Sequence, residues 1–314
     1  MTATLLEPVE VATRRGAEPG RRRRQRSPLV SVLMVAPAVL FLALFVFLPA
    51  AMALGIGFFH YHLLGVGTTF AGLTNFKDAL SYPIFWRAAE NTALFALLMV
   101  PTTLVGSVAI ALVLNGTSRG FGLLRSIVLL PYVTPVVATA IGWIWIFNPQ
   151  YGVANYVLHG LGLPGSQWLL SPTMALPSVA IYTLWHGLGF DVVLVLAGLA
   201  SLPRDVMEAA SIDGAGRWQR FYKVQMPLLS PTLFFVAFVS TLGALQSFSQ
   251  IYALSSGQGG PGFATTTLLL LIYQTAFSYF HFSYGAAMAL LLVVMILVVV
   301  GFQRWLARRW AFYQ

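Results

Sequence analysis

Apolar blocks of about twenty residues constrain this chain more than any other feature of its sequence, because a helix of that length crosses the roughly 30 Å hydrocarbon core of a bilayer. Lipid offers no partner to a free backbone amide or carbonyl, so each block is expected to be helical. Six spans are predicted: Leu29–Phe59, Asn91–Leu114, Ser126–Phe147, Thr173–Leu199, Leu228–Leu254 and Tyr284–Phe302. The sequence therefore predicts an all-α membrane protein whose six transmembrane helices lie within residues 29–303.

A further apolar segment, Thr265–Phe282, is predicted to be short and only partly inserted. Its aromatic residues, together with Ser278 and His281, suit such a segment better than a full span. A seventh span would also place the two termini on opposite sides of the membrane, which the charge pattern does not support.

Composition agrees with a membrane protein. The chain is 58% hydrophobic and 9% charged, whereas a soluble domain carries about 25% charged residues. A net charge of +9 also suits a nucleic-acid-binding protein, but basic residues that flank spans on the cytoplasmic side explain it better, so no nucleic acid partner is expected. The absence of cysteine excludes disulfides and thiolate metal sites.

The Lys and Arg residues predict the topology. With the N-terminus inside, 16 of the 18 lie on the cytoplasmic side, and only Lys77 and Arg87 lie outside. Both termini are therefore predicted to be cytoplasmic, as a disordered basic tail over residues 1–28 near anionic membrane lipid and a second tail over residues 304–314. The paired arginines of the first tail resemble an export signal, but the apolar run that follows is too long for a cleaved one.

Two strings resemble nucleotide-binding motifs. Residues Gly160–Gly165 match GxGxxG, but they lie in a predicted external loop that contains Pro164, so a turn is expected. Residues Leu254–Gln258 loosely match a nucleotide-contacting loop and are expected to end the fifth span. No GxxxxGK[ST] phosphate loop occurs, so the chain is not expected to hydrolyse ATP itself, and no cofactor is expected on it.

The loop between spans four and five, residues 203–227, is the most informative segment. Pro203 suits the first turn of a short helix. Asp213-Gly214 is expected to end that helix, because glycine readily adopts positive φ. A second short amphipathic helix follows and is expected to end at Pro227. The residues alone allow either a basic anchor at the membrane surface or a docking surface for another protein.

The 203–227 loop resembles the EAA loop of permease subunits of ATP-binding-cassette importers. In that family E-A-A is followed by three residues, G, nine residues and I-x-L-P. Here Glu208-Ala209-Ala210 is followed at the same spacings by Gly214 and Val224-Gln225-Met226-Pro227. Other segments resemble the carbohydrate-uptake branch of the family, of the sugar or glycerol-3-phosphate type: Leu124–Pro131, Ala197–Leu199, Ile212–Ala215 and Gly259–Pro261.

The resemblance implies a type I importer permease fold in the bacterial cytoplasmic (inner) membrane. It implies that this subunit is not an enzyme and forms half of a translocation pathway. The implied partners are two ATPase subunits that carry ATP and Mg²⁺, a second permease subunit and an extracytoplasmic substrate-binding protein. The implied ATPase-coupling residues are Glu208, Ala209, Ala210, Asp213, Gly214 and Pro227.

Polar groups inside apolar spans are costly and are therefore candidates for substrate contact, although interhelical hydrogen bonding is the alternative role. Helical spacing places three of them, one turn after Gly243, on one stripe of span five: Gln246, Ser249 and Gln250. On span four the candidates are Tyr182, Trp185, His186, Gly189 and Asp191. Trp143, Trp145 and Trp185 are candidates for stacking on a sugar face, with interfacial placement or packing as the alternative.

Charge inside the spans predicts the substrate. No Lys or Arg lies inside a predicted span, and burying a phosphate without a cation is very costly. A neutral polyhydroxylated substrate is therefore expected, with glycerol-3-phosphate or a glycerophosphodiester as the alternative if the partner permease supplies a cation. An ion-coupled secondary transporter would need more intramembrane ionisable groups than Asp191 and His186. An intramembrane hydrolase would need a catalytic pair, and neither an aspartyl dyad nor HExxH occurs.

Overall fold

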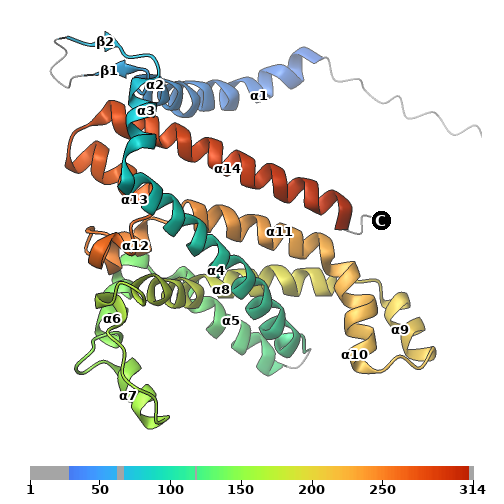
Figure 1. Cartoon of the computed structure of the whole chain (residues 1–314). Coiled ribbons are helices and arrows are strands. Elements are labelled where there is room, and N and C mark those ends of the chain that lie inside the picture. The colour runs from blue at the N-terminus through green and yellow to red at the C-terminus, as the bar shows by residue number, and fades with distance from the viewer. Residues whose placement is uncertain (1–27, 62–66, 117–118, 311–314) are drawn as a thin grey trace, which may run out of the picture. The chain divides into compact units, whose positions relative to one another are not determined.

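The computed structural model describes residues 28–61, 67–116 and 119–310, which are almost entirely helical (Figure 1). The chain divides into two units, residues 1–50 and 51–314. The basic N-terminal tail, up to residue 27, lies outside the described residues. A two-stranded antiparallel sheet, β1 (Phe59–His60) and β2 (Thr69–Phe70), pairs Phe59 with Phe70.

The first unit holds helix α1 (Pro28–Leu42) and the π-helical turn η1 (Ala43–Phe47). From Val32 to Ala50 every residue is exposed, and nearly all are apolar. A helix that is apolar on all sides suits lipid contact rather than a water-facing surface. Helix α2 (Leu48–Ile56) completes the candidate span Val32–Ile56, in agreement with the first predicted span.

Among the described residues, five helices are long and apolar enough to cross a membrane, and a sixth is obtained if one bent pair counts as a single span. Besides Val32–Ile56, the long helices are α4 (Pro83–Leu114), α8 (Ala175–Ala200), α11 (Met226–Leu245) and α14 (Phe282–Trp310). These helices confirm the predicted all-α fold with up to six spans. Helix α14 continues to Trp310, so residues 304–310 extend the last helix and do not form a separate tail.

The bent pair is span three. Helix α5 (Arg119–Val133) and helix α6 (Val136–Ile146) meet at 96° across Thr134 and Pro135. Pro135 has no N–H to continue the helical ladder, and its ring disfavours the α conformation of the preceding residue, so the bend has a local cause. The predicted third span, Ser126–Phe147, covers both helices and the bend.

Short elements lie between the spans: α3 (Thr74–Ser81), α7 (Val153–Gly160), η2 (Trp168–Leu170), α12 (Ser249–Leu254), η4 (Pro261–Phe263), α13 (Leu268–Tyr273) and η5 (Gln274–Ser278). Helices α13 and η5 form the predicted short apolar segment, Leu268–Ser278. The GxGxxG string is a turn after α7, where Gly162 has a φ of 74°.

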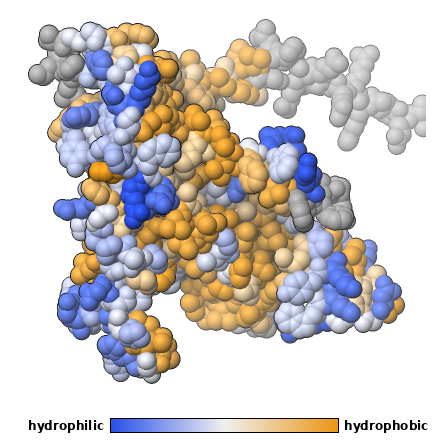
Figure 2. Space-filling view, viewed as in Figure 1, coloured by the Kyte–Doolittle hydropathy of each residue, from blue (hydrophilic) through white to orange (hydrophobic). Residues whose placement is uncertain are grey.

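Helices α4, α5, α8 and α11 pack together within the second unit. Small residues let them approach closely, since a Cβ at Gly189 of α8 would lie 2.2 Å from the Val128 carbonyl oxygen of α5. Figure 2 shows hydrophobic residues across the middle of this bundle and hydrophilic residues gathered at its two ends. A helical bundle embedded in lipid requires this distribution, because its middle contacts hydrocarbon and its two ends contact water.

The 203–227 loop forms helix α9 (Arg204–Ile212), helix α10 (Arg217–Arg220) and the π-helical turn η3 (Phe221–Gln225). The predicted helix–turn–helix is present. The predicted end of its second helix at Pro227 is wrong, because the helix runs without a break from Arg217 to Leu245. Pro227 therefore lies inside a continuous helix, where it supplies no N–H to the preceding turn, and that turn, η3, is π-helical.

Candidate functional site

The turn of the 203–227 loop is built as the sequence predicted. Gly214 has a φ of 75° and follows the last residues of α9. Ala215 N–H donates to the Ala210 carbonyl (3.0 Å), and Gly214 N–H donates to the Ser211 carbonyl (3.2 Å). These two bonds define a Schellman cap, in which a glycine at the left-handed position ends the helix. The cap sets the angle between α9 and α10.

Helix α9 has exposed side chains that form no hydrogen bond or ion pair within the described part of the chain. No side chain of α9 is buried; Glu208 and Ala209 are exposed, and Ile212 is 86% exposed. Among the described residues, Glu208 forms no ion pair. An exposed isoleucine beside a small alanine and an unpaired carboxylate is a surface that another protein can contact closely.

The inner face of the 203–227 loop is held by arginines. A cavity of about 600 Å³ lies between it and the ends of α4, α5 and α8, and Arg125, Arg204 and Glu208 contribute to its lining. Arg220 Nη1 donates to Ser211 Oγ at 2.7 Å and ties α10 to α9. Arg125 Nη2 donates to the carbonyls of Leu114 and Gly116 at 2.9 Å and so caps the end of α4.

A second cavity, of about 340 Å³, lies in the middle of the bundle between α4, α5, α8, α11 and α12. Four residues singled out from the sequence line it: Tyr182, His186, Asp191 and Gln250. Asp191 is only 8% exposed, and its carboxylate has no hydrogen bond or ion pair among the described residues. A buried charge without a partner is costly, so this carboxylate is the strongest sign of a ligand site.

The predicted polar stripe on span five does not exist as a continuous helical face. Helix α11 ends at Leu245, Phe248 has φ −133° and ψ −63°, and α12 starts at Ser249. Gln246 and Ser249 are exposed and do not line the cavity, whereas Gln250 does. The break has a tertiary cause, since Thr267 Oγ1 donates to the Ser247 carbonyl at 3.3 Å in place of a bond along the helix.

Tyr182 and His186 donate hydrogen bonds to backbone carbonyls next to the bend of span three. The Tyr182 hydroxyl donates to the Val136 carbonyl at 2.7 Å and shares a hydrogen bond of 2.8 Å with Thr139. His186 Nε2 donates to the Thr134 carbonyl at 3.1 Å. Inside a membrane, backbone groups at a bend need such partners. Both side chains therefore have a structural task as well as a place in the cavity wall.

The three tryptophans proposed for sugar stacking do not line the cavity. The ring of Trp143 packs between Trp185 (centroids 5.3 Å apart) and Phe147 (5.1 Å), and Trp145 is 69% exposed. An aromatic face is instead supplied by Tyr132 and Phe190, whose rings stack at 4.9 Å and 16° and both line the cavity.

Sequence reasoning missed several cavity residues. Phe190 lies four residues after His186 and shares its helical face, so periodicity was sufficient to find it. Tyr132 depends on the bend at Pro135 and gave no such signal. Ser240 also lines the cavity, and its buried hydroxyl has no hydrogen-bond partner. Among the described residues, no group of three or more His, Cys, Asp or Glu side chains is arranged to hold a metal ion.

The chemistry of the cavity wall is that of a hydrogen-bond acceptor with one aromatic face. A carboxylate, a hydroxyl and an amide lie on it, and of its described lining residues none is Lys or Arg. Such a wall can accept hydrogen bonds from several hydroxyl groups and place a ring against Tyr132 and Phe190. It has no Lys or Arg among its described lining residues to offset the charge of an anion.

Comparison with known proteins gives a consistent result. Residues 102–312 match the family described as "Binding-protein-dependent transport system inner membrane component". The sulfoquinovosyl glycerol transport system permease of Agrobacterium fabrum is 35% identical over 80% of this chain and 81% of its own length. The trehalose/maltose transport system permease of Thermococcus litoralis is 34% identical (82% and 85%), and the lactose transport system permease of Rhizobium radiobacter is 34% identical (79% and 83%).

Solved structures share the fold. A chain of a bacterial ABC transporter that imports the acidic polysaccharide alginate superposes with a TM-score of 0.76 at 24% identity, over 90% of this chain and 96% of that one. A chain of a bacterial alginate ABC transporter in complex with an alginate-bound periplasmic protein gives a TM-score of 0.74 at 22% identity, over 90% and 94%.

Proposed function

Because this chain belongs to the inner membrane components of binding-protein-dependent transport systems, we propose that it forms half of the translocation pathway of an ATP-driven importer for neutral, polyhydroxylated glycosides. The protein is a multi-pass inner-membrane permease subunit and not an enzyme, and ATP is hydrolysed by a separate subunit. The proposal assigns the pathway to the 340 Å³ cavity and the coupling to helix α9.

The unpaired carboxylate of Asp191 carries the substrate proposal. A buried carboxylate accepts two or more hydrogen bonds, and neighbouring hydroxyls of a glycoside donate them. The Ser240 hydroxyl and the stacked rings of Tyr132 and Phe190 add a polar contact and a flat surface on the same wall. A phosphate ester would face Asp191 with no Lys or Arg among the described lining residues. The names of the trehalose/maltose and lactose permeases agree with a neutral substrate, whereas the sulfoquinovosyl glycerol permease is named for a glycoside that carries a sulfonate.

Coupling is proposed to pass through α9 as a rigid body. Helix α9 lies between α8 and the continuous helix that leads into α11, and both α8 and α11 line the cavity. A partner that moves α9 therefore moves two walls of the cavity together. The proposed contacts with an ATPase subunit are exposed Glu208 and Ala209, half-buried Ala210 and the cap formed by Asp213 and Gly214.

The proposed assembly holds this chain, a second permease subunit, two ATPase subunits and an extracytoplasmic substrate-binding protein. A related transporter structure contains a periplasmic protein, which supports the last partner. The distribution of Lys and Arg supports cytoplasmic termini, with α9 on the ATPase side. ATP and Mg²⁺ are assigned to the ATPase subunits, and no cofactor is assigned to this chain.

The test is ATP hydrolysis and uptake in proteoliposomes that contain the whole complex. A neutral disaccharide is expected to stimulate both more than a phosphate ester does. Asp191→Leu is expected to reduce stimulation by the disaccharide about tenfold, which corresponds to roughly 1.4 kcal/mol of lost interaction. Asp78→Asn, outside the cavity lining, is the control and is expected to behave as the wild type. Stronger stimulation by the phosphate ester, unchanged by Asp191→Leu, contradicts the proposal.

A further inference from the structure

The loop between α12 and α13, residues 255–267, has an unusual backbone. Six of its residues have positive φ: Ser256, Gly257, Gly259, Gly260, Gly262 and Phe263. Four of these are glycines, but Phe263, at φ 61°, holds a bulky side chain in the left-handed region. Such a strained backbone conformation persists only where contacts with the surrounding residues stabilise it. Strained residues of this kind are often found at functional sites.

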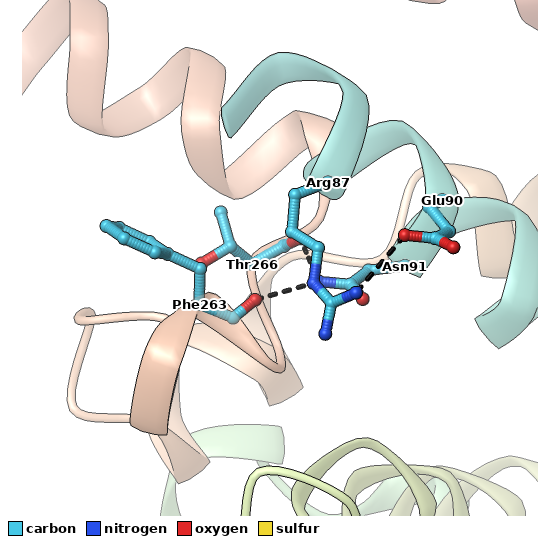
Figure 3. A network of polar contacts seen from close by, with 5 residues as sticks. All are labelled: Arg87, Glu90, Asn91, Phe263 and Thr266. Atoms are coloured by element: carbon cyan, nitrogen blue, oxygen red, sulfur yellow. Dashed lines mark hydrogen bonds and ion pairs between the residues drawn. The ribbon is translucent and has the colours of Figure 1, made fainter. Parts of the chain in front are cut away.

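Helix α4 supplies these contacts. Asn91 Nδ2 donates to the carbonyls of Phe263 (2.8 Å) and Thr266 (3.0 Å), as Figure 3 shows. One residue further, Thr92 Oγ1 accepts from Leu268 N–H at 2.9 Å. Asn91 and Thr92 are buried, as are Thr266 and Leu268, so water does not replace the bonds between these residues. Figure 3 also shows the neighbouring ion pair of Arg87 and Glu90 on α4, which is exposed and therefore contributes little.

From the 255–267 loop the contacts continue to the break in span five. Thr267 Oγ1 donates to the Ser247 carbonyl at 3.3 Å, and both residues are buried. The Ser247 hydroxyl in turn accepts from Gln250 Nε2 at 2.5 Å. Gln250 is the one residue of the predicted polar stripe that lines the cavity. A chain of hydrogen bonds thus runs from α4 through the loop to the cavity wall.

We infer that Asn91 and Thr92 are positioning residues that, through the 255–267 loop, fix the break in span five and orient the Gln250 amide in the cavity. The inference rests on the proposed function and deepens it. Because Nε2 of Gln250 is engaged by Ser247, the amide presents Oε1, which accepts no hydrogen bond among the described residues. Gln250 therefore adds a second acceptor to the wall that carries Asp191, and the pair selects ligands rich in hydroxyl donors.

The physical reason is that the contacts have no substitute. Removal of the Thr92 hydroxyl leaves the Leu268 N–H buried and unpaired, and removal of the Asn91 amide does the same to the Thr266 carbonyl. The Phe263 carbonyl loses one of its two hydrogen bonds and keeps the bond from the Thr266 N–H. The start of α13 then shifts, Thr267 moves from Ser247, and the Gln250 amide is free to rotate. The expected loss is in recognition of substrate, which is separate from docking of the ATPase at α9.

A double-mutant cycle tests the inference, with uptake by the reconstituted complex as the measurement. Thr92→Val keeps the shape of threonine and removes the acceptor, and it is expected to lower kcat/KM for a neutral disaccharide about tenfold. Thr92→Ser keeps the hydroxyl and is expected to retain wild-type uptake. Thr102→Val on the same helix is the matched control, because Thr102 Oγ1 bonds only within α4. In a Gln250→Ala background, Thr92→Val is expected to cost less than about twofold, since its effect passes through the amide.

An equal loss from Thr92→Val in both backgrounds overturns the inference, because the residue then acts independently of Gln250. A loss that Thr92→Ser shares, or that follows a fall in thermal stability in detergent, overturns it as well. Asn91→Ala is a second variant for the same cycle, and its loss of kcat/KM is likewise compared between the wild-type and Gln250→Ala backgrounds. If the disaccharide fails to stimulate the wild type, the proposed substrate class is wrong, and the cycle is then run with whichever ester or sugar does stimulate.

Discussion

Gly214 and Gly259 have nearly the same backbone conformation in opposite surroundings. Their φ angles are 75° and 80°. Gly214 ends α9, and Gly259 lies in the loop that follows α12. A Cβ added at Gly214 would meet nothing within 4 Å, whereas one at Gly259 would lie 2.0 Å from Thr266 Oγ1. A glycine with positive φ is thus packed against another side chain in the 255–267 loop and has open space around it in the 203–227 loop.

The contrast extends to the neighbouring side chains. Thr265, Thr266 and Thr267 are all buried, while α9 buries no side chain. A loop packed in this way completes its structure within the subunit and fixes the geometry of the cavity. A loop whose apolar and charged groups face outward completes its structure only with a partner. The internally packed loop and the proposed coupling surface therefore lie at opposite ends of the bundle (Figure 1).

The largest expected effect comes from placing the same residue at both glycines. Gly259→Val combines backbone strain with a clash and is expected to cost about 4 kcal/mol or more of stability, enough to lose folded protein. Gly214→Val is strained by roughly 1–2 kcal/mol only and is expected to insert and fold. Its altered Schellman cap is expected to abolish substrate-stimulated ATP hydrolysis. The yield of monodisperse protein and ATPase stimulation are the two measurements.

Gly216→Val is the control for Gly214→Val, because Gly216 has an ordinary φ of −64° and open space around it. Normal stimulation in Gly214→Val would show that the angle between α9 and α10 is not used for coupling. Equal losses of folded protein at Gly214 and Gly259 would remove the contrast between the two ends.

A smaller effect is expected from trimming one isoleucine at each end. Ile251 of α12 is 0% exposed and Ile212 of α9 is 86% exposed. Ile251→Ala leaves a cavity and is expected to destabilise the protein by about 2–5 kcal/mol, measured as a lower thermal unfolding midpoint. Ile212→Ala is expected to leave that midpoint unchanged and to weaken co-purification with the ATPase. A lowered midpoint for Ile212→Ala would mean that α9 packs against this chain and not against a partner.

The smallest expected effect concerns charge on α9. Glu208→Gln is expected to weaken ATPase association about fivefold, because one exposed ion pair contributes little once screened by salt. Titration of the permease complex with the ATPase at low and high salt measures it. Asp205→Asn, in the first turn of the same helix, is the control and is expected to have no effect. A salt-independent loss, or an equal loss for both variants, contradicts a charge contact at Glu208.

The sequence was sufficient for features with local causes. Long apolar runs predicted the spans, and Asp213-Gly214 predicted the turn, because lipid and the left-handed backbone each leave few choices. The spacing of Glu208, Gly214 and Pro227 predicted the family, although Pro227 does not end a helix. The break at residues 246–248 was not predictable, since it depends on Thr267, about twenty residues further along the chain.

The candidate site was predicted only where the position of a residue does not depend on tertiary contacts. Asp191 was predicted because a carboxylate inside an apolar span is unusual whichever face of the helix carries it. The structure places Asp191 in the lining of the cavity. Gln246 and Ser249 were placed by assuming an unbroken helix, and the structure turns them away from the cavity. Tyr132 was missed because its position depends on the bend at Pro135, and bends are set by packing as well as by proline.

The bend of span three links two distant positions. The carbonyl of Val136, the first residue of α6 after the bend at Pro135, accepts a hydrogen bond from the hydroxyl of Tyr182 at 2.7 Å. A permease with a straight third span has no need for that hydroxyl, and phenylalanine fills the same space. Proline at 135 and tyrosine at 182 are therefore expected to be gained and lost together as such sequences diverge. The bend would then be detectable as covariation between positions 135 and 182 in an alignment of homologous sequences.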